Sequence, residues 1–357
     1  MSQAPVCVLV VAPSHRTGSS YLGELLASPR SSVYFFEPLW YFPTYEKIYH
    51  VNSDRLREVI KLLFTCQLTS IKYIFPDLQS RKFILRRPRG LSTLQDLDVI
   101  ERICKASEVR VMKVVRAQLY QVLPLLYTTN WSALTRMEEE IPSHSPSFKL
   151  IYLIRDPRAI LTSILEREMD FSPQRKDPEL LCETILQDLQ ALKALPRQHH
   201  HSVTVVRYED MVTDAVGSAQ RLFRFSNLPL TSEVYQFLLD HNKDRSAFSL
   251  PTLRYASPTQ TLFRRAWPSL IRQHSPRNAT KANKYSFSHL ILYKNQVYNV
   301  KKYMKKRRKR MESGYTYYST YKRPNKPIDR WKNELNQETR ARLEEACGPA
   351  LQEFEYN

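Results

Sequence analysis

The sequence predicts an α/β fold with a central parallel sheet flanked by helices, and three observations support this. Near-continuous apolar runs of the kind that buried parallel strands need occur at residues 6–12, 148–154 and 202–208. A segment with apolar residues at helical spacing follows each run. Strands and helices that alternate in this way form parallel sheets with right-handed crossovers. We therefore expect three layers, with helices on both faces of one sheet.

The first predicted strand leads into a polar loop with the composition of a phosphate-binding turn. Residues 16–20 read Arg-Thr-Gly-Ser-Ser, and apolar residues at helical spacing begin at Tyr21. N–H groups at a helix N-terminus attract anions, and a glycine lets the backbone approach them closely. The loop is not a Walker A motif, because Ser19 stands where that motif has its Lys. The turn predicts phosphate binding in a P-loop-like fold, with an ordinary strand-to-helix turn that binds no phosphate as the alternative.

The middle of the chain continues the alternation. Apolar side chains recur at helical spacing after Ser53, and Ser92 with Gln95 forms a capping box before another such segment. The predicted elements are, in order, a strand at 32–39, helices at 53–68 and 92–103, a strand at 109–115 and a helix at 118–127. The segment at 128–147 has the composition of a loop or an insertion.

A second polar stretch follows the strand predicted at 148–154. It reads Arg155-Asp156-Pro157-Arg158, and proline is well suited to the first turn of a helix. The remaining predicted elements are helices at 157–167 and 179–194, a buried strand at 202–208, and helices at 214–224, 232–241 and 336–354. Ligands of parallel sheets bind beyond the carboxyl ends of the strands. We therefore expect the stretches at Arg16 and Arg155 to open onto the same crevice.

The excess of basic residues is confined to one segment. Residues 251–332 hold 21 Lys and Arg residues against Glu312 and Asp329, and this surplus equals the net charge of the whole chain, +19. Its densest part is the run KKYMKKRRKR at 301–310. Such a run would suit contact with a polyanion, for example a sulfated glycan, a nucleic acid or an acidic membrane. The alternatives are a solvated, partly disordered insertion and a chance resemblance to a nuclear-localisation signal.

Composition limits the remaining possibilities. A chain of 357 residues can bury the core of one large domain, and we predict a single domain over 1–357 with a basic, weakly patterned insertion at 251–320. No apolar run approaches the roughly 20 residues of a membrane-spanning helix. The five cysteines form no CxxC pair, which disfavours a zinc site. Their odd number fits either a reducing compartment or a lumenal one with one or two disulfides and a free thiol.

Several short motifs, in this order along the chain, resemble those of a known enzyme family. They are Arg16–Ser20, the FEPLW run at 36–40, Arg155–Arg158 with Ser163, the VRYED run at 206–210, and Arg330–Lys332 with Cys347. The chain resembles the sulfotransferases that use 3′-phosphoadenosine 5′-phosphosulfate (PAPS). The FEPLW run resembles more narrowly the carbohydrate sulfotransferases that modify the 6-hydroxyl of galactose, N-acetylgalactosamine or N-acetylglucosamine. The resemblance covers residues 6–65, 108–242 and 320–357.

The resemblance implies that the two polar stretches hold the two anionic ends of PAPS, the sulfate donor. The residues implied around the 5′-phosphate are Arg16, Thr17, Gly18, Ser19 and Ser20. Arg155 and Ser163 are implied at the 3′-phosphate. Arg323 stands where the family has a basic residue, late in the chain, that contacts the same phosphate. By analogy with phosphoryl transfer, catalysis is positioning plus stabilisation of charge on the leaving oxygen, which is the role implied for Arg16. No metal is expected.

The resemblance also implies an acceptor side to the site. Glu37 is the candidate base for a sugar hydroxyl, and a structural carboxylate paired with Arg16 or Lys113 is the alternative. Lys113 and Arg116 are candidates for contact with the sulfonate or with an acidic acceptor, and a surface salt bridge is the alternative role for them. We expect Arg207 to be structural, tied to Glu209 or Asp210. Glu355 stands where the family usually has glycine, a difference that concerns packing more than chemistry.

The expected function is therefore transfer of a sulfuryl group from PAPS to a sugar hydroxyl, at position 6, of a glycan or proteoglycan. The alternatives are a catalytically inactive polyanion-binding protein on the same fold, and a P-loop kinase, which the missing GK[ST] disfavours. No specific nucleic-acid partner is expected. The resemblance implies the Golgi lumen, although this sequence carries no membrane anchor; a soluble cytoplasmic protein is the alternative.

Overall fold

The computed structural model describes residues 5–41, 53–74, 85–87, 97–115, 117–129, 147–166, 176–241 and 327–356. All of them belong to one compact unit built from residues 1–255 and 323–357. The basic insertion predicted at 251–320, with the run at 301–310, lies outside the described residues, as does the capping box of Ser92 and Gln95.

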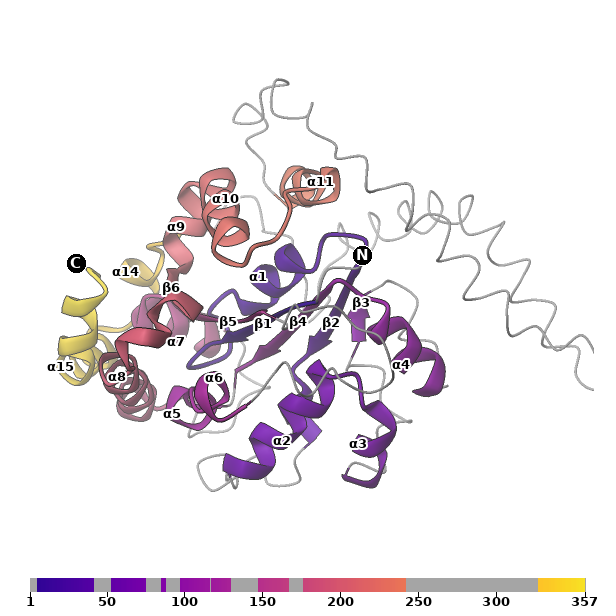
Figure 1. Cartoon of the computed structure of the whole chain (residues 1–357). Coiled ribbons are helices and arrows are strands. Elements are labelled where there is room, and N and C mark those ends of the chain that lie inside the picture. The colour runs from indigo at the N-terminus through magenta and orange to yellow at the C-terminus, as the bar shows by residue number, and fades with distance from the viewer. Residues whose placement is uncertain are drawn as a thin grey trace, which may run out of the picture. The chain divides into compact units, whose positions relative to one another are not determined.

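A six-stranded sheet with the order β3-β2-β4-β1-β5-β6 forms the centre of the unit (Figure 1). Its strands are β1 Val6–Val11, β2 Ser32–Phe36, β3 Leu85–Arg87, β4 Val109–Val114, β5 Ser147–Ile154 and β6 Val203–Arg207. The five strands from β2 to β6 in this order are parallel, as predicted. Strand β3, which pairs antiparallel with β2 at the edge of the sheet, was not predicted.

Helices cover both faces of the sheet, which confirms the three layers (Figure 1). One face carries α1 Ser19–Leu26, α10 Ala215–Phe225 and α11 Ser232–His241. The other carries α2 Ser53–Phe64, α3 Leu68–Ile74, α5 Leu119–Val122 and α6 Leu125–Thr128. The other α-helices of the described ranges are α4 Leu97–Lys105, α7 Pro157–Leu165, α8 Pro178–Lys193, α9 Tyr208–Thr213, α14 Trp331–Glu334 and α15 Gln337–Glu353. None of the described helices is long and apolar enough to cross a membrane.

The apolar runs of the sequence are explained by burial on both faces of the sheet. Side chains alternate between the faces along a strand. In β1, Val8 and Val10 join the apolar cluster formed with α1, α10 and α11. Leu9 and Val11 are also fully buried and belong to the opposite face. A strand at the centre of such a sheet therefore cannot show the polar alternation of a half-exposed one.

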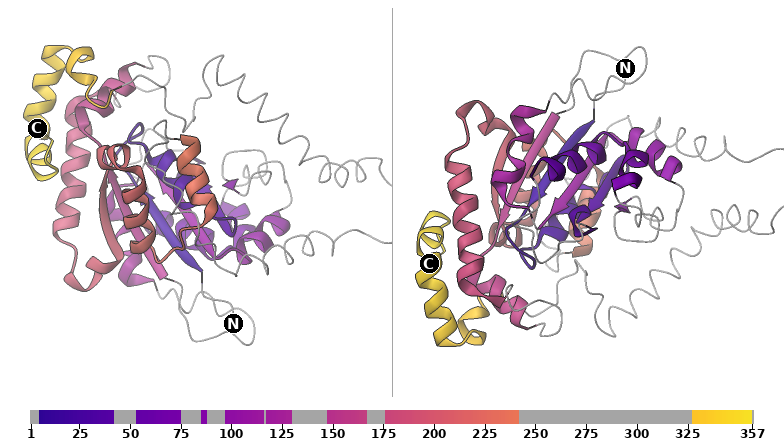
Figure 2. Two further views of the ribbon diagram at one scale, coloured as in Figure 1. Left: turned by 90° about the horizontal axis from the view of Figure 1, so that it is seen from above. Right: turned by 90° about the horizontal axis from the view of Figure 1, so that it is seen from below.

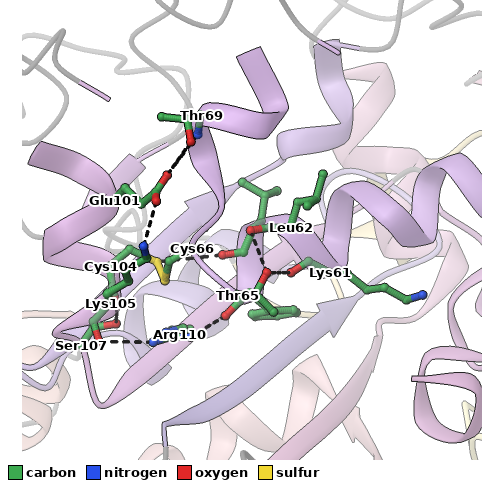
Figure 3. The surroundings of a disulfide bond; sticks show 12 residues. Lys61, Leu62, Thr65, Cys66, Thr69, Glu101, Cys104, Lys105, Ser107 and Arg110 are labelled. Carbon is green, nitrogen blue, oxygen red and sulfur yellow. Dashed lines mark hydrogen bonds and ion pairs between the residues drawn. A yellow bond between two sulfur atoms is a disulfide. The ribbon is translucent and has the colours of Figure 1, made fainter. Parts of the chain in front are cut away.

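Two disulfides join elements outside the sheet to one another. The bond between Cys66, just after α2, and Cys104, in the last turn of α4, joins the ends of these two helices (Figure 3). The bond between Cys182 and Cys347 joins α8 to α15, and these two helices run side by side (Figure 2). Cys7 is free and buried. This pattern matches the second alternative for the cysteines, two disulfides and a spare thiol.

A buried arginine accompanies the first disulfide. Arg110 of β4 donates from Nη1 to the carbonyl of Phe64 at 2.6 Å and from Nη2 to that of Lys105 at 3.4 Å (Figure 3). These carbonyls end α2 and α4, where the last turn of a helix leaves acceptors unpaired and a cation is favourable. Arg110 and the disulfide thus hold the same two helix ends together.

Local chemistry accounts for the boundaries that the sequence misplaced. The helix predicted at 118–127 is two short helices, because Pro124 has no N–H with which to continue the first. The strand predicted at 32–39 ends at Phe36, since Glu37 has a φ of +48°. The helix predicted at 53–68 ends at Phe64, and Cys66 turns the chain with a φ of +58°. The strand predicted as buried at 202–208 is the edge strand β6, with Val205 40% exposed.

Candidate functional site

The candidate site lies at the carboxyl edge of the sheet, where each parallel strand brings a polar or aromatic side chain. Arg16 follows β1, Glu37 follows β2, and Arg155 follows β5 directly. Lys113 is the last residue but one of β4, and Tyr208 comes directly after β6. This is the edge at which parallel α/β sheets bind their ligands.

The turn between β1 and α1 is shaped as an anion-binding turn. The carbonyl of Gly18 accepts hydrogen bonds from the amides of Tyr21 and Leu22 and so begins α1, and no side chain caps the helix N-terminus. Thr17 is fully buried and donates from its hydroxyl to the carbonyl of Ser14 at 3.2 Å. A helix N-terminus of this kind carries a partial positive charge and free N–H donors.

Gly18 is required by a close approach as well as by its backbone. Its φ is +95°, a conformation that residues with side chains rarely adopt. A Cβ at this position would lie 2.3 Å from Cδ2 of Tyr208. The ring of Tyr208 therefore packs directly on the turn, a contact that motif reasoning on Gly18 alone could not anticipate.

The two polar stretches meet at this edge. Arg16 donates from Nε to the hydroxyl of Ser163, on α7, at 3.0 Å. Arg155 donates from Nη1 to the carbonyl of Arg16 at 2.8 Å, and its guanidinium carbon lies 4.6 Å from the centre of the Tyr208 ring. The Nε of Arg155 is buried and makes no hydrogen bond in the described part of the chain. Two guanidinium groups, one hydroxyl and a helix N-terminus thus lie close together.

Glu37 and Lys113 form a second, adjoining cluster. The ammonium of Lys113 contacts Oε1 of Glu37, and the two side chains are 2% and 8% exposed. The same ammonium donates to the hydroxyl of Ser20 at 3.3 Å, which joins this cluster to the first turn of α1. Nε2 of His15 lies 3.8 Å from the other oxygen of Glu37. The carboxylate of Glu37 thus lies between an ammonium and an imidazole at the sheet edge.

Two residues of these clusters have a strained backbone. Arg16 has a φ of +68° and Glu37 a φ of +48°. Positive φ values in residues with side chains cost free energy and are found preferentially at functional sites. Both residues are thus held in place by the fold rather than by local preference.

Other residues of the motifs have structural roles. Arg158 pairs with Asp156 and with Glu344 of α15, both at 3.0 Å, and stacks at 3.9 Å on the Trp331 ring. Asp156 also caps α7 by accepting from the amide of Arg158. Arg207 is structural as expected, but its partner is different: it donates to the carbonyl of Glu355 at 3.3 Å instead of pairing with Glu209 or Asp210.

Some predicted site residues cannot be placed, and some contributors were missed. Arg116 and Arg323 lie outside the described residues. Ser19 is buried at the start of α1. No role was predicted for His15 or Tyr208, although His15 directly precedes Arg16 and Tyr208 is the last residue of the strand predicted at 202–208. Within the described ranges, no three His, Cys, Asp or Glu side chains gather so as to hold a metal ion.

A family model described as "Sulfotransferase domain" matches residues 8–266. Curated relatives include carbohydrate sulfotransferase 4 of Mus musculus, 24% identical over 68% of this chain, and carbohydrate sulfotransferase 3 of Tetronarce californica, 25% identical over 66%. Carbohydrate sulfotransferase 3 of Homo sapiens is 24% identical over 65%. The chain spans 70%, 61% and 56% of the lengths of these three proteins.

Similar solved structures carry related descriptions. One is a sulfotransferase domain from the curacin biosynthetic pathway, with 17% identity and a TM-score of 0.34 over 83% of this chain and 99% of that one. Another is mouse sulfotransferase SULT7A1 complexed with PAP, with 12% identity and a TM-score of 0.34 over 76% and 85% of the two chains.

Proposed function

The chain belongs to the sulfotransferase domain family, and from this membership we propose that it transfers a sulfuryl group from PAPS to a hydroxyl of a carbohydrate. The observation that carries the proposal is the contact between the two polar stretches. Arg16 reaches Ser163, and Arg155 reaches the carbonyl of Arg16, at the uncapped N-terminus of α1. Two cations and a helix N-terminus at one point of the sheet edge suit a ligand with two phosphate ends.

The donor is proposed to lie across this edge. The turn at Arg16–Ser20 would hold the 5′-phosphosulfate end through its backbone amides, its hydroxyls and Arg16. Arg155 and Ser163 would hold the 3′-phosphate, and the buried, unbonded Nε of Arg155 is a donor suited to an anion. Arg323 stays a proposed contributor on family grounds.

The acceptor reaction needs a base and a group to stabilise the leaving charge. The hydroxyl oxygen forms a bond to sulfur while the bond from sulfur to the phosphate oxygen breaks, and the phosphate leaves with that electron pair. Arg16 would stabilise the charge on the phosphate. Glu37 would accept the hydroxyl proton, and Lys113 would keep its carboxylate ionised and aimed. Lys113 and Arg116 are further candidates for contact with the sulfonate or an acidic acceptor.

The acceptor is proposed to be a glycan, with transfer to its 6-hydroxyl. The support is that the curated relatives are named carbohydrate sulfotransferases. The FEPLW run, which this proposal links to 6-hydroxyl acceptors, ends at Trp40 on the short 3-10 helix Pro38–Tyr41 behind Glu37. A secretory lumen such as that of the Golgi is the proposed location, because disulfides persist in oxidising compartments and the chain has two.

The proposal is tested by calorimetric titration of 3′-phosphoadenosine 5′-phosphate (PAP), without Mg²⁺, into the wild-type protein and Arg155→Ala. We expect micromolar binding to the wild type and a loss of about 2 kcal/mol or more in the variant, roughly thirtyfold in Kd. Arg197→Ala, which removes an exposed arginine from the 3-10 helix Arg197–Ser202, is the control and should bind as the wild type does.

Two outcomes would contradict the proposal. A well-folded wild type that does not bind PAP would leave polyanion binding as the function to pursue. Binding of ATP that depends on Mg²⁺, together with ATP turnover, would favour a kinase. A glycan acceptor screen with PAPS would follow a positive result and would test the 6-hydroxyl assignment.

A further inference from the structure

The last residues of the chain fold back from α15 in a defined turn. The amide of Tyr356 donates to the carbonyl of Leu351 at 2.8 Å, and the amide of Glu355 donates to that of Gln352 at 3.2 Å. Glu355 has a φ of +55°. This is the Schellman motif that closes many helices, with the left-handed position taken here by glutamate. It directs Tyr356 away from the helix axis and into the protein, where only 6% of it is exposed.

The side chain and backbone of Tyr356 are fixed by two arginines. Arg158 donates from Nη2 to the Tyr356 carbonyl at 3.1 Å. The guanidinium carbon of Arg207, the last residue of β6, lies 4.7 Å from the centre of the Tyr356 ring. One contact holds the backbone and the other covers a face of the ring, so both stabilise the observed position of Tyr356.

The Tyr356 hydroxyl points at the carboxylate of Glu209. It donates to Oε2 at 3.1 Å, and the amide of Asp156 donates to Oε1, also at 3.1 Å. Glu209 therefore connects the end of the chain to the residue directly after Arg155. It also directly follows Tyr208, whose ring lies under the Arg155 guanidinium. The Glu209 carboxylate thus links Tyr356 to Asp156, the residue after Arg155, and Glu209 itself adjoins Tyr208, on whose ring the Arg155 guanidinium lies.

The position of this carboxylate has an electrostatic consequence. Burial raises the pKa of Glu209, and the charge of Arg155, together with the hydrogen bonds from Asp156 and Tyr356, lowers it again in part. Arg155 and Glu209 attract each other, yet they form no direct ion pair within the described residues; the carboxylate is occupied by the amide and the phenol. A carboxylate released from these donors would be free to pair with Arg155 and to compete with an anionic ligand.

We propose that Tyr356 is a positioning residue for the donor site, holding the Glu209 carboxylate away from Arg155 so that the guanidinium stays available for the 3′-phosphate. This inference rests on the proposed function. It assigns the C-terminal residues a part in donor binding, although none of them is placed against the donor itself.

The test is PAP titration into wild type, Tyr356→Phe, and the double variant Tyr356→Phe with Glu209→Gln. The Phe variant keeps the ring and loses only the hydroxyl. We expect a roughly tenfold weaker Kd for PAP in Tyr356→Phe, which corresponds to about 1.4 kcal/mol. We expect a Kd near that of the wild type in the double variant, because glutamine carries no charge with which to compete. Tyr235→Phe, at a half-buried tyrosine of α11, is the matched control.

The outcomes separate the two proposals. Wild type that binds PAP while Tyr356→Phe binds equally well would overturn this inference and leave the donor assignment standing. A weaker Tyr356→Phe that also melts at a lower temperature, and that Glu209→Gln does not restore, would show a structural role only and would also overturn it. No binding of PAP to folded wild type would remove the donor assignment itself and this inference with it.

Discussion

A substitution of Glu37 tests the proposed chemistry most directly. Its carboxylate is buried, contacts the ammonium of Lys113 and follows β2 with a strained backbone. A carboxylate that served only to neutralise Lys113 would have the same partners. The two roles differ in what they do to turnover, so kinetics can separate them.

We expect Glu37→Gln to lower kcat for sulfuryl transfer by at least about 100-fold, the range in which general base catalysis contributes. PAP affinity should change little, because the donor contacts are assigned to other residues. The measurement is steady-state kinetics with PAPS and a glycan acceptor, alongside PAP titration and thermal unfolding. A variant that keeps its kcat while its melting temperature falls would assign Glu37 a purely structural role.

The sequence predicted which side chains lie at the carboxyl edge of the sheet but not their contacts. Arg16, Glu37, Lys113 and Arg155 follow or end apolar strands, and the carboxyl ends of parallel strands meet at one edge. The packing of Tyr208 on Gly18 could not be predicted, because it joins residues 190 positions apart through a strand order that the sequence does not state. The hydrogen bonds that Glu209 accepts from Asp156 and Tyr356 could not be predicted for the same reason.

At the scale of elements, central strands were easier to predict than edge elements. The run at β1 is apolar throughout, and the run at β5 is interrupted only by Lys149 after its first residue Ser147, because both faces of these strands are buried. The short edge strand β3 spans only Leu85–Arg87 and carries no such signal. The apolar residues of 118–127 recur at helical spacing, and this pattern led to the prediction of one helix. The structure has two, α5 and α6, because Pro124 lies between them.

Helices α5 and α8 are joined by a buried carboxylate whose titration should be visible. Asp188 of α8 is fully buried and accepts from the amide of Leu119, the first residue of α5, at 2.7 Å. Burial raises the pKa of Asp188 to about 7. Its pKa in the unfolded chain is close to 4, so the folded state binds the extra proton between about pH 4 and pH 7. Its contribution to stability is therefore lost as pH rises through that window.

We expect Asp188→Asn to remove this pH dependence, because asparagine offers the same oxygen to Leu119 and does not titrate. The free energy of unfolding of the variant, relative to wild type, should rise between about pH 4 and pH 7 by an amount on the order of a few kcal/mol and stay constant above it. Denaturant titrations of both proteins across this range give the difference. Parallel curves for the two proteins would contradict the assignment.

At the scale of the whole molecule, the two disulfides close loops of very different length. Cys66 and Cys104 are 38 residues apart, and Cys182 and Cys347 are 165 apart. Restricting the unfolded chain stabilises the folded one by an amount that grows with the loop, about 4 and about 5 kcal/mol for these lengths. The longer loop should therefore matter more, by about 1 kcal/mol.

We expect the pair Cys182→Ala with Cys347→Ala to unfold at lower denaturant concentration than the pair Cys66→Ala with Cys104→Ala. Equilibrium unfolding in guanidinium chloride under non-reducing conditions is the measurement. Dithiothreitol added to the wild type should lower its midpoint below that of either double variant, since it opens both loops. A reversed order of the two double variants would show that local packing, and not loop length, decides their stability.

The bond between Cys182 and Cys347 also fixes the covalent connectivity of the molecule. A chain cleaved once between β6 and α15 remains a single covalent species, since the fragment that carries the sheet stays attached through sulfur to the fragment that carries α15. The peptide link across the basic residues 251–332 is thus dispensable for keeping Tyr356 near the sheet. A two-chain form produced by proteolysis in that stretch would run as one band until it was reduced, and it would retain the C-terminal contact to Glu209.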